Sequence, residues 1–318
     1  MINWQPTASI DNLKKRAQIV ADIRAFFAER GVWEVDTPVL SNASITDVQL
    51  RFLETRTQGV AGNRRLFLHT SPEFAMKRLL CAGSGSIYQL AKVFRDDECG
   101  RNHNPEFTLL EWYRVGFDHH QLMAEMDALL QRVLHCGASE KLSYQAAFER
   151  HLDINCFTVS DTELANLAVS KAQYIGTPLS RDALLQLLFS IVIEPQLGRD
   201  VPCFIHDYPA SQAALARVRN ETYAVASRFE VYVQGLELAN GFHELSDAAK
   251  QRRRFEQDNR ERVRDHVVAG VLDEPLLHAL QHGLPDCAGV ALGIDRLIML
   301  ALKAQHIDDV LSFPIARA

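Results

Sequence analysis

The chain has 318 residues, of which 47% are hydrophobic and 23% are charged, and its formal net charge is −6. This composition supports a large buried core, and the acidic balance does not favour a protein that coats nucleic acid. The N-terminus lacks the pattern of a signal peptide, and the strongest apolar run, at 184–193, is too short to span a bilayer. The six cysteines form no C-x-x-C pair, so we expect reduced thiols in a cytoplasmic protein and no zinc site.

The chain begins with a predicted helix. Apolar residues recur at helical spacing from Ser9 to Arg30. Ser9 or Asp11 can cap its start, and Gly31 ends it.

A short strand and a second helix are expected next. The strand is predicted at 32–35, and because Pro38 cannot donate to a ladder, this strand should lie at a sheet edge or an interface. The helix is predicted over 71–80, with Ser71 as its N-cap and Pro72 at its first helical position.

Two predicted strands, 87–95 and 107–113, flank a loop that is dense in charge. Arg95 and acids such as Asp96 suit a triphosphate with Mg²⁺, because a guanidinium binds phosphate oxygens in a bidentate geometry. A solvated loop on a core hairpin would explain the same pattern, so the loop alone does not decide the function.

The second of these strands carries chemically distinct side chains on one face. Side chains alternate along a strand, so Phe107, Leu109, Glu111 and Tyr113 share a face. That face offers a ring for stacking, a carboxylate and a phenol in one row.

The middle of the chain, roughly 120–225, is expected to be mostly helical. Asp182 to Glu194 is apolar on nearly every side and stops at Pro195, which is typical of a buried core helix. This region carries little functional information.

A hairpin with two acids follows. A two-residue turn at 234–235 would place Tyr232 opposite Glu237 and Glu230 opposite Ala239. Glu230 and Glu237 would then be diagonal neighbours on one face, within reach of one hard cation. The alternative is an exposed hairpin edge decorated with charge.

The last informative stretch is GVALGIDRLIMLAL, a strand that runs directly into a helix. Gly289, Ala291 and Gly293 share one strand face, and a face without large side chains lets a ligand approach the backbone. Asp295 and Arg296 open the helix, whose N-terminus favours anions. Tight packing against a neighbouring helix is the other reading.

The order of these elements predicts the fold class. Strands are separated by long helical stretches without regular βαβ alternation, which favours an α+β domain with a mostly antiparallel sheet. We expect a single domain over 1–318, in which the three chemistry-bearing segments build one nucleotide pocket.

Together these segments resemble the signature motifs of class II aminoacyl-tRNA synthetases. RGVWEVDTPVLS resembles motif 1, FRDDE with NPEFTLLEWY resembles motif 2, and GVALGIDRLIML resembles motif 3. TSPEFAMKRLL and ELANGFHEL are similar to the lysine branch of that class. The resemblance covers nearly the whole chain and implies an antiparallel sheet flanked by helices, and a homodimer.

The resemblance implies an ATP site with Mg²⁺. Arg95 would hold the α-phosphate, Arg296 would hold the far end of ATP, and Phe107 would stack on adenine. Glu230 and Glu237 would bind Mg²⁺. The remaining nucleotide contacts that the resemblance implies are Asp96, Asp97, Asn104, Leu238 and Gly293.

The resemblance also implies an amino-acid site. Glu73 would take one ammonium group, Glu111, Tyr113 and Glu244 would take the side-chain ammonium, and Asn240 would face the carboxylate. Acids without an opposing arginine favour a doubly positive amino acid on electrostatic grounds. Three further residues are assigned to this substrate site, namely Ser71, Pro72 and Ala291.

Departures from lysyl-tRNA synthetases refine the expectation. The first predicted helix begins near residue 9, which leaves no anticodon-binding barrel, so tRNA is an improbable partner. Ala291 stands where those synthetases have glycine, and one methyl group can shift selectivity by roughly 1–3 kcal/mol. Asp97 stands where motif 2 usually has glutamate, so its carboxylate is one methylene shorter while its charge is kept. The pattern resembles truncated synthetase-like ligases that attach (R)-β-lysine to a lysine of elongation factor P.

Other functions stay open at this point. An asparagine-synthetase-like amide ligase also has a class II core, although its aspartate substrate would demand an arginine. A regulatory paralogue that binds an amino acid without catalysis tends to lose the motif arginines and acids, which are all present here. Aminoacylation of tRNA through acceptor-stem contacts alone is a third alternative.

Overall fold

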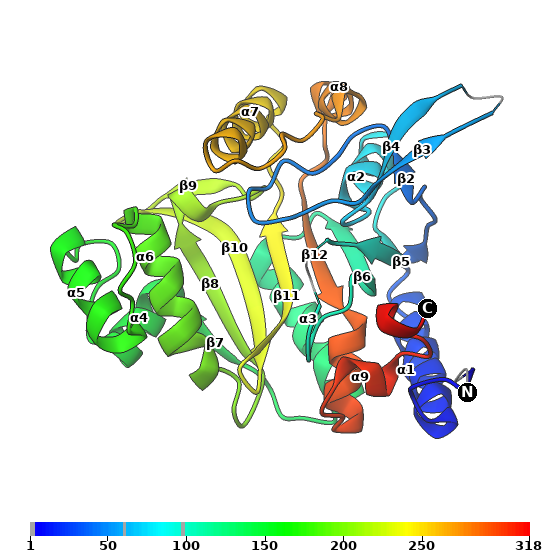
Figure 1. Cartoon of the computed structure of the whole chain (residues 1–318), viewed down its shortest axis with the longest axis horizontal. Helices are drawn as coiled ribbons and strands as arrows, with labels where there is room; N and C mark the ends of the chain where they lie inside the picture. Colours follow the sequence, from blue (N-terminus) through cyan, green and yellow to red (C-terminus); the bar gives the residue numbers. More distant parts are fainter. Residues whose placement is uncertain (1–3, 60–61, 97–98) are drawn as a thin grey trace. The chain divides into compact units, whose positions relative to one another are not determined.

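The computed structural model describes residues 4–59, 62–96 and 99–318. The chain divides into two compact units, one formed by 1–116 with 245–318 and the other by 117–244 (Figure 1). The expected single-domain organisation over 1–318 stays a prediction. Within the described ranges, no helix combines the length and apolar character that a bilayer crossing needs. The six cysteines are free thiols.

The first unit opens with α1 (Ile10–Ala28). The Ser9 hydroxyl caps this helix by accepting a hydrogen bond from the Asn12 N–H at 3.1 Å. Gly31 follows the helix with a φ of 64°, a conformation that glycine adopts without strain. The predicted start and stop are therefore confirmed.

A sheet in the order β1-β5-β6-β12 forms the centre of this unit. β1 pairs in parallel with β5, whereas β5–β6 and β6–β12 are antiparallel. β1 is shorter than predicted, but it does lie at an edge. The strands span Trp33–Glu34 (β1), Ile87–Phe94 (β5), Glu106–Val115 (β6) and Cys287–Gly293 (β12).

A small second sheet and four helices complete the first unit. The sheet has the order β2-β4-β3. Its strands span Leu40–Ser41 (β2), Glu54–Thr57 (β3) and Arg64–Leu68 (β4). The helices are α2 (Glu73–Cys81), α7 (Ala248–Arg264), α8 (Glu274–His282) and α9 (Ile294–Leu302). Short 3₁₀ turns follow at Ile307–Val310 and Ile315–Arg317.

The start of α2 corrects one expectation. Pro72 occupies the N-cap position rather than the first helical position, with φ −77° and ψ 1°. The Ser71 hydroxyl accepts a hydrogen bond from the Glu73 N–H at 3.2 Å, so it stabilises the turn just before the helix. Glu73 therefore stands at the first helical residue.

The second unit contains a sheet in the order β11-β10-β8-β7, with β9 also paired to β10. Its strands span Glu140–Ser143 (β7), Cys203–Pro209 (β8), Val218–Asn220 (β9), Ala224–Val233 (β10) and Leu236–His243 (β11). Its helices are α3 (His119–Leu134), α4 (Tyr144–Leu152), α5 (Asp161–Ala172) and α6 (Arg181–Leu188). β7, β8 and β9 lie in the region that was predicted to be mostly helical.

The predicted core helix at 182–194 is also corrected. α6 ends at Leu188, and a π-helical turn (Phe189–Ile193) and a 3₁₀ turn (Glu194–Gln196) continue the chain. Ile191 is 52% exposed, so the segment is not buried on every side. Pro195 fits the start of the 3₁₀ turn, where its missing N–H costs no hydrogen bond.

The β10–β11 hairpin has the predicted turn but a different register. Gln234 and Gly235 have φ values of 55° and 73°, and Tyr232 lies opposite Glu237 as expected. Glu230, however, lies opposite Asn240 instead of Ala239. A bulge shifts the register between Val231 and Tyr232, since β11 contains one extra residue there. Mostly antiparallel pairing in both units confirms the α+β class.

Candidate active site

The two ends of the charged loop between β5 and β6 are hydrogen-bonded to each other. The Arg95 N–H donates to the Pro105 carbonyl at 2.9 Å. The Arg95 guanidinium carbon lies 5.1 Å from the centroid of the Phe107 ring, a cation–π distance. Arg95 and Phe107, the predicted phosphate and adenine residues, are therefore neighbours. Asp97 lies outside the described residues.

Asn104 fixes the end of the same loop. Its side chain is nearly buried, and its amide donates to the Glu106 carbonyl at 2.6 Å. Its amide oxygen accepts from the Ile315 N–H at 2.9 Å. These contacts give Asn104 a structural role, and its contact with nucleotide stays a prediction.

Arg296, at the start of α9, reaches the same loop. Its Nε donates to the Asn102 carbonyl at 3.3 Å, and its Nη2 lies 2.5 Å from His103 Nε2. The preceding Asp295 is 2% exposed and accepts from Arg16 at 2.5 Å and from the Thr108 N–H at 2.7 Å. The helix start is thus fixed, and motifs 2 and 3 meet at this loop. His103 was missed because nothing in its local pattern indicates this contact.

The strand with small residues lies beside the predicted amino-acid residues. Ala291 pairs with Glu111, and Gly289 pairs with Tyr113, across the β6–β12 ladder. Residues opposite each other in a ladder share a face, so the small residues of β12 lie on the same face as Glu111 and Tyr113. The Tyr113 hydroxyl donates to Glu111 Oε1 at 2.6 Å, and both side chains are 2% exposed.

Glu73 has a basic neighbour that the sequence reasoning missed. Lys77 Nζ lies 2.6 Å from Glu73 Oε1, and the Lys77 side chain is 2% exposed. The spacing of four residues on a helix is the signal that could have predicted this pair. The pair fixes the Glu73 carboxylate.

In the second unit, Glu230 is surrounded by hydrogen-bond donors. Its carboxylate accepts from the Arg228 guanidinium and from the hydroxyls of Tyr208 and Tyr232. Burial, followed by the charge of Glu230, raises the pKa of both tyrosines well above the ordinary value, so the phenols stay protonated donors. Glu230 therefore has less room for a metal ion than the sequence suggested.

Arg228 links Glu230 to Asn240. Its Nε lies 3.3 Å from Asn240 Oδ1. Burial lowers the pKa of Arg228, but the charge of Glu230, with smaller contributions from Tyr208 and Glu237, raises it overall. Arg228 alternates with Glu230 and Tyr232 along β10, which places all three on one face. This alternation is the sequence signal that could have predicted the contact between Arg228 and Glu230.

The other predicted residues of this unit lie on β11 and just after it. Glu237 lies opposite Tyr232. Leu238 is the extra residue at the bulge and is 3% exposed. The Glu244 side chain is 1% exposed, and its carbonyl accepts from Arg217 Nε at 2.9 Å. Among the described residues, no group of three or more His, Cys, Asp or Glu is arranged to hold a metal ion.

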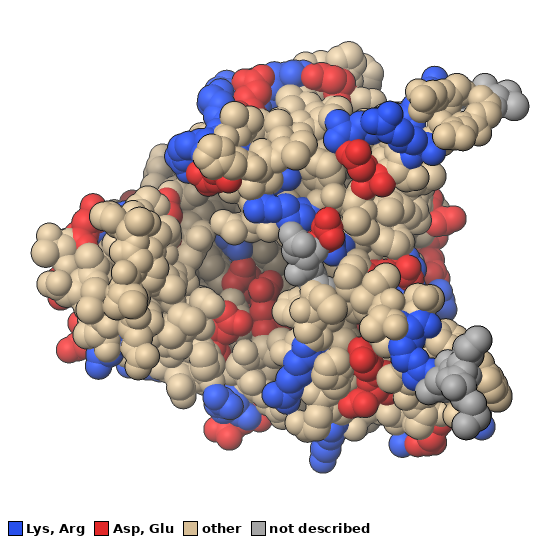
Figure 2. Space-filling model, in the orientation of Figure 1, with Lys and Arg blue, Asp and Glu red and all other residues tan. Residues whose placement is uncertain are grey.

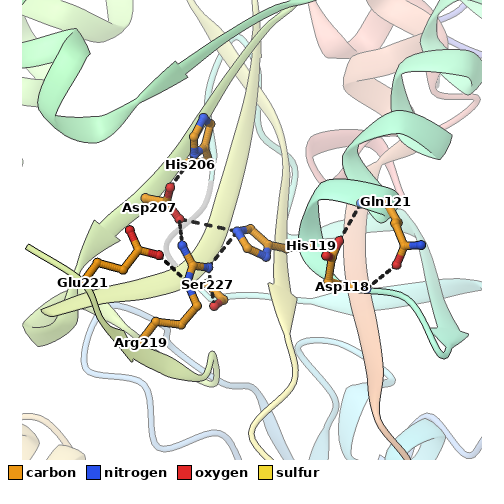
Figure 3. Close-up of polar contacts among 8 residues, drawn as sticks. All are labelled: Asp118, His119, Gln121, His206, Asp207, Arg219, Glu221 and Ser227. Carbon is orange, nitrogen blue, oxygen red and sulfur yellow. Dashed lines mark hydrogen bonds and ion pairs between the residues drawn. The ribbon is translucent and has the colours of Figure 1, made fainter.

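A second polar cluster occupies the other face of this sheet (Figure 3). His206 pairs with Phe229, so it lies on the face opposite Glu230. Asp207 accepts from Arg219 Nη2 at 2.6 Å and from His206 Nδ1 at 2.8 Å. His119 Nε2 lies 3.4 Å from Asp207 Oδ1. Since it faces away from Glu230 and Asn240, we treat this cluster as structural.

Comparison with known proteins gives the family. Residues 2–317 match the family model described as tRNA synthetases class II (D, K and N). A protein of Yersinia enterocolitica is 54% identical, covering 99% of this chain and 98% of its own. One of Vibrio parahaemolyticus is 57% identical over 98% of each chain, and one of Edwardsiella ictaluri is 53% identical over 100% and 99%. Each of the three is named elongation factor P–(R)-β-lysine ligase.

Proposed function

The chain belongs to the class II tRNA synthetase family (D, K and N), and from this premise we propose that it activates a lysine-type amino acid with ATP and transfers it to elongation factor P. The amino acid is (R)-β-lysine and the acceptor is a lysine ε-amine. Relatives that are 53–57% identical along nearly the whole chain bear the name of this activity.

One observation carries the ATP half of the proposal. Arg95 and Arg296 come from motifs that lie about 200 residues apart in the chain, yet Arg95 starts the β5–β6 loop and Arg296 hydrogen-bonds within it. Two guanidinium groups and a stacking ring gathered around one loop fit the phosphates and the base of a nucleotide. A surface hairpin needs no such arrangement.

The first step is attack of the amino-acid carboxylate on the α-phosphorus of ATP, with pyrophosphate as the leaving group. No protein nucleophile is required. Arg95 and Arg296 orient the phosphates and stabilise the charge on the transferring phosphoryl oxygens. Phe107 stacks on adenine and so keeps the phosphates of the nucleotide beside the two arginines. In the second step the acceptor amine attacks the aminoacyl carbonyl, and AMP leaves.

The amino-acid contacts follow from the acids on β6 and α2. Tyr113 donates to Oε1 of Glu111 and so orients this carboxylate, which would accept the side-chain ammonium. Lys77 holds Oε1 of Glu73, so the other oxygen would take the second ammonium. Asn240 and Glu244 belong to the second unit, where Arg228 Nε lies 3.3 Å from Asn240 Oδ1, and their roles toward the substrate stay predictions.

Magnesium is the expected companion of ATP. Mg²⁺ prefers one or two carboxylates together with phosphate oxygens. Glu230 and Glu237 are the two carboxylates that would serve, and the oxygens of Glu230 already accept from an arginine and two phenols. When bound, the ion would neutralise charge on the phosphate oxygens.

The remaining parts of the proposal concern the compartment, the oligomeric state and the acceptor of the enzyme. We place it in the cytoplasm as a homodimer that uses a protein acceptor rather than tRNA. Pro38 and the edge strand β1 mark the face on which a second copy would pack.

The direct test is ATP–pyrophosphate exchange measured across lysine isomers. We expect exchange with (R)-β-lysine above that with α-lysine, and none with aspartate. Arg95→Ala should lower the exchange rate by a factor on the order of 10²–10³, because one charge-stabilising contact is lost. Its melting temperature should stay near that of the wild type, because the side chain is not part of a core.

Two results would contradict the proposal. Exchange with aspartate would favour an amide ligase, and binding of lysine without any exchange would favour a regulatory paralogue. Undiminished exchange in Arg95→Ala would remove the assigned role of that arginine.

A further inference from the structure

α7 is rich in arginine, and basic side chains gather over it on the surface (Figure 2). One of these arginines behaves differently from the others. Arg262 is 1% exposed, whereas Arg260, on the same helix, is exposed. Burying a guanidinium costs several kcal/mol unless its donors are satisfied. The burial of Arg262 therefore has to be matched by specific contacts.

Arg262 donates to three backbone carbonyls. Its Nη1 lies 2.5 Å from the Asp47 carbonyl and 2.8 Å from the Leu50 carbonyl. Its Nε lies 2.7 Å from the Val268 carbonyl. The guanidinium carbon also lies 5.3 Å from the centroid of the Phe52 ring. Only the forked geometry of arginine offers donors in these directions.

Two of these carbonyls belong to a segment that we call the strap, residues 44–52, which joins β2 to β3 and contains no helix or strand. Further bonds tie the strap to α7 and to the segment after it. The Ser44 N–H donates to the Val271 carbonyl at 3.0 Å, and the Thr46 hydroxyl donates to Asp258 at 3.0 Å. Arg262 thus joins the strap, α7 and the segment after α7.

The strap in turn supports the loop that carries Arg95. The Asp96 N–H donates to the Arg51 carbonyl at 3.1 Å. Arg51 directly follows Leu50, one of the residues that Arg262 holds. A continuous chain of backbone contacts therefore runs from Arg262 through the strap to the residue next to Arg95.

We propose that Arg262 is a positioning residue for the ATP-binding loop. By holding the Asp47 and Leu50 carbonyls it fixes the Arg51 carbonyl, which anchors Asp96 and sets the position of Arg95. This inference relies on the proposed function, since it is that function which assigns Arg95 to the α-phosphate. Arg262 itself is buried against the strap, and the proposed function assigns it no substrate contact.

A purely structural role for Arg262 predicts different kinetics. Loss of stability alone would lower the melting temperature and leave the kinetics of the folded fraction unchanged. Loss of positioning acts on ATP, because Arg95 moves relative to the phosphates. Glu111 and Tyr113 lie within the β6 ladder rather than on the strap, so the KM for the amino acid should change little.

The experiment compares Arg262→Met and Arg262→Lys with Arg260→Met as the matched control. Arg260 lies two residues away on the exposed side of α7 and makes no ion pair among the described residues. For each protein, the KM for ATP, the KM for (R)-β-lysine and kcat are measured in the exchange assay. Hydrogen–deuterium exchange of the peptide that contains the Asp96 amide reports whether the hydrogen bond from this amide to the Arg51 carbonyl is kept. This measurement does not depend on enzyme activity.

We expect Arg262→Met to lower kcat/KM for ATP by a factor on the order of 10–100, because small displacements of a charge-positioning group have effects of this size. The KM for the amino acid should stay within about threefold, and the Asp96 amide should lose protection. The kcat/KM for ATP of Arg262→Lys should lie between those of the wild type and Arg262→Met. The lysine ammonium keeps the charge but cannot donate to all three carbonyls. Arg260→Met should match the wild type.

The proposal is wrong if folded Arg262→Met retains the wild-type KM for ATP and Asp96 protection. If Arg262→Met does not fold, the same criteria apply to Arg262→Lys. Wild-type protein that shows no exchange with any lysine isomer would instead contradict the proposed function. In that case Asp96 protection and calorimetric ATP binding in the Arg262 variants still test the positioning role.

Discussion

Ala291 is the residue whose single methyl group most directly bears on substrate choice. It pairs with Glu111 across the β6–β12 ladder, so its methyl group lies on the same sheet face as the predicted ammonium acceptor. Gly289 and Gly293 on that face add no side chain. On this face of the strand, the Ala291 methyl group is thus the only side chain between these two glycines.

For Ala291→Gly we expect a relative gain for α-lysine over (R)-β-lysine in the exchange assay. Removing one methyl group from a pocket floor changes selectivity by roughly 1–3 kcal/mol, which corresponds to a ratio of about 5 to 150 in kcat/KM. The ratio of the two kcat/KM values is the quantity to measure. Gly289→Ala is a useful comparison, because it adds a methyl beside Tyr113 instead. An unchanged preference in Ala291→Gly would show that the methyl group does not select the isomer.

Single residues also mark the limit of prediction from sequence. Ser9, Gly31 and the 234–235 turn were predicted correctly, because their signals are local and each favours one backbone conformation. The ion pair of Arg228 with Glu230 was not predicted. Two residues of opposite charge on one strand face permit a pair, but tertiary packing decides whether it forms.

At the scale of elements, bulges place the polar side chains of the second unit. The register between β8 and β10 shifts between Ala226 and Phe229, and Asp207 has a φ of 58°. Asp tolerates this left-handed conformation better than most residues. The Asp207 carboxylate thereby contacts Arg219 and His119 (Figure 3). Alternation of apolar residues carries no information about such an extra residue, so neither this bulge nor the one in β11 could be predicted.

The Asp207 cluster predicts an acid-dependent stability. We expect Asp207→Asn to lower the free energy of unfolding by about 1–3 kcal/mol at pH 7, since it removes a charged acceptor from Arg219 and His206. Asn tolerates the same backbone conformation. Glu221→Gln is the matched control: Glu221 also pairs with Arg219, but its side chain is 56% exposed, so the change should stay within about 0.5 kcal/mol. Urea unfolding measures both.

The pH dependence follows from the direction of the pKa shift. Burial raises the pKa of Asp207, but hydrogen bonds from His119, His206 and Arg219 outweigh burial and hold this pKa well below its ordinary value. A carboxyl with a lowered folded-state pKa stabilises the protein above its unfolded pKa, and this stability is lost as the pH falls. The difference in free energy of unfolding between the wild type and Asp207→Asn should therefore become smaller below about pH 4. A gap that stays constant from pH 7 to pH 3 would contradict this account.

At the scale of the whole molecule, the sequence motifs predicted the strands better than the periodicity of apolar residues did. Motif strands 87–95 and 107–113 correspond to β5 and β6, because they are long, strongly apolar and bounded by charge. β7, β8 and β9 were missed, since β7 and β9 are short, and all three lie in a stretch rich in helical patterns. The hydrogen bonds of Arg262 to the strap join residues more than 200 positions apart, which no local pattern indicates.

The most direct test of the account is transfer to the acceptor itself. The chain is incubated with ATP, (R)-β-lysine and purified elongation factor P, and the acceptor is analysed by intact mass and peptide mapping. We predict that one lysine-type group is added to a single lysine of the acceptor, that this requires ATP, and that Arg95→Ala does not support it. An acceptor of unchanged mass under conditions in which the chain forms AMP from ATP would contradict the account.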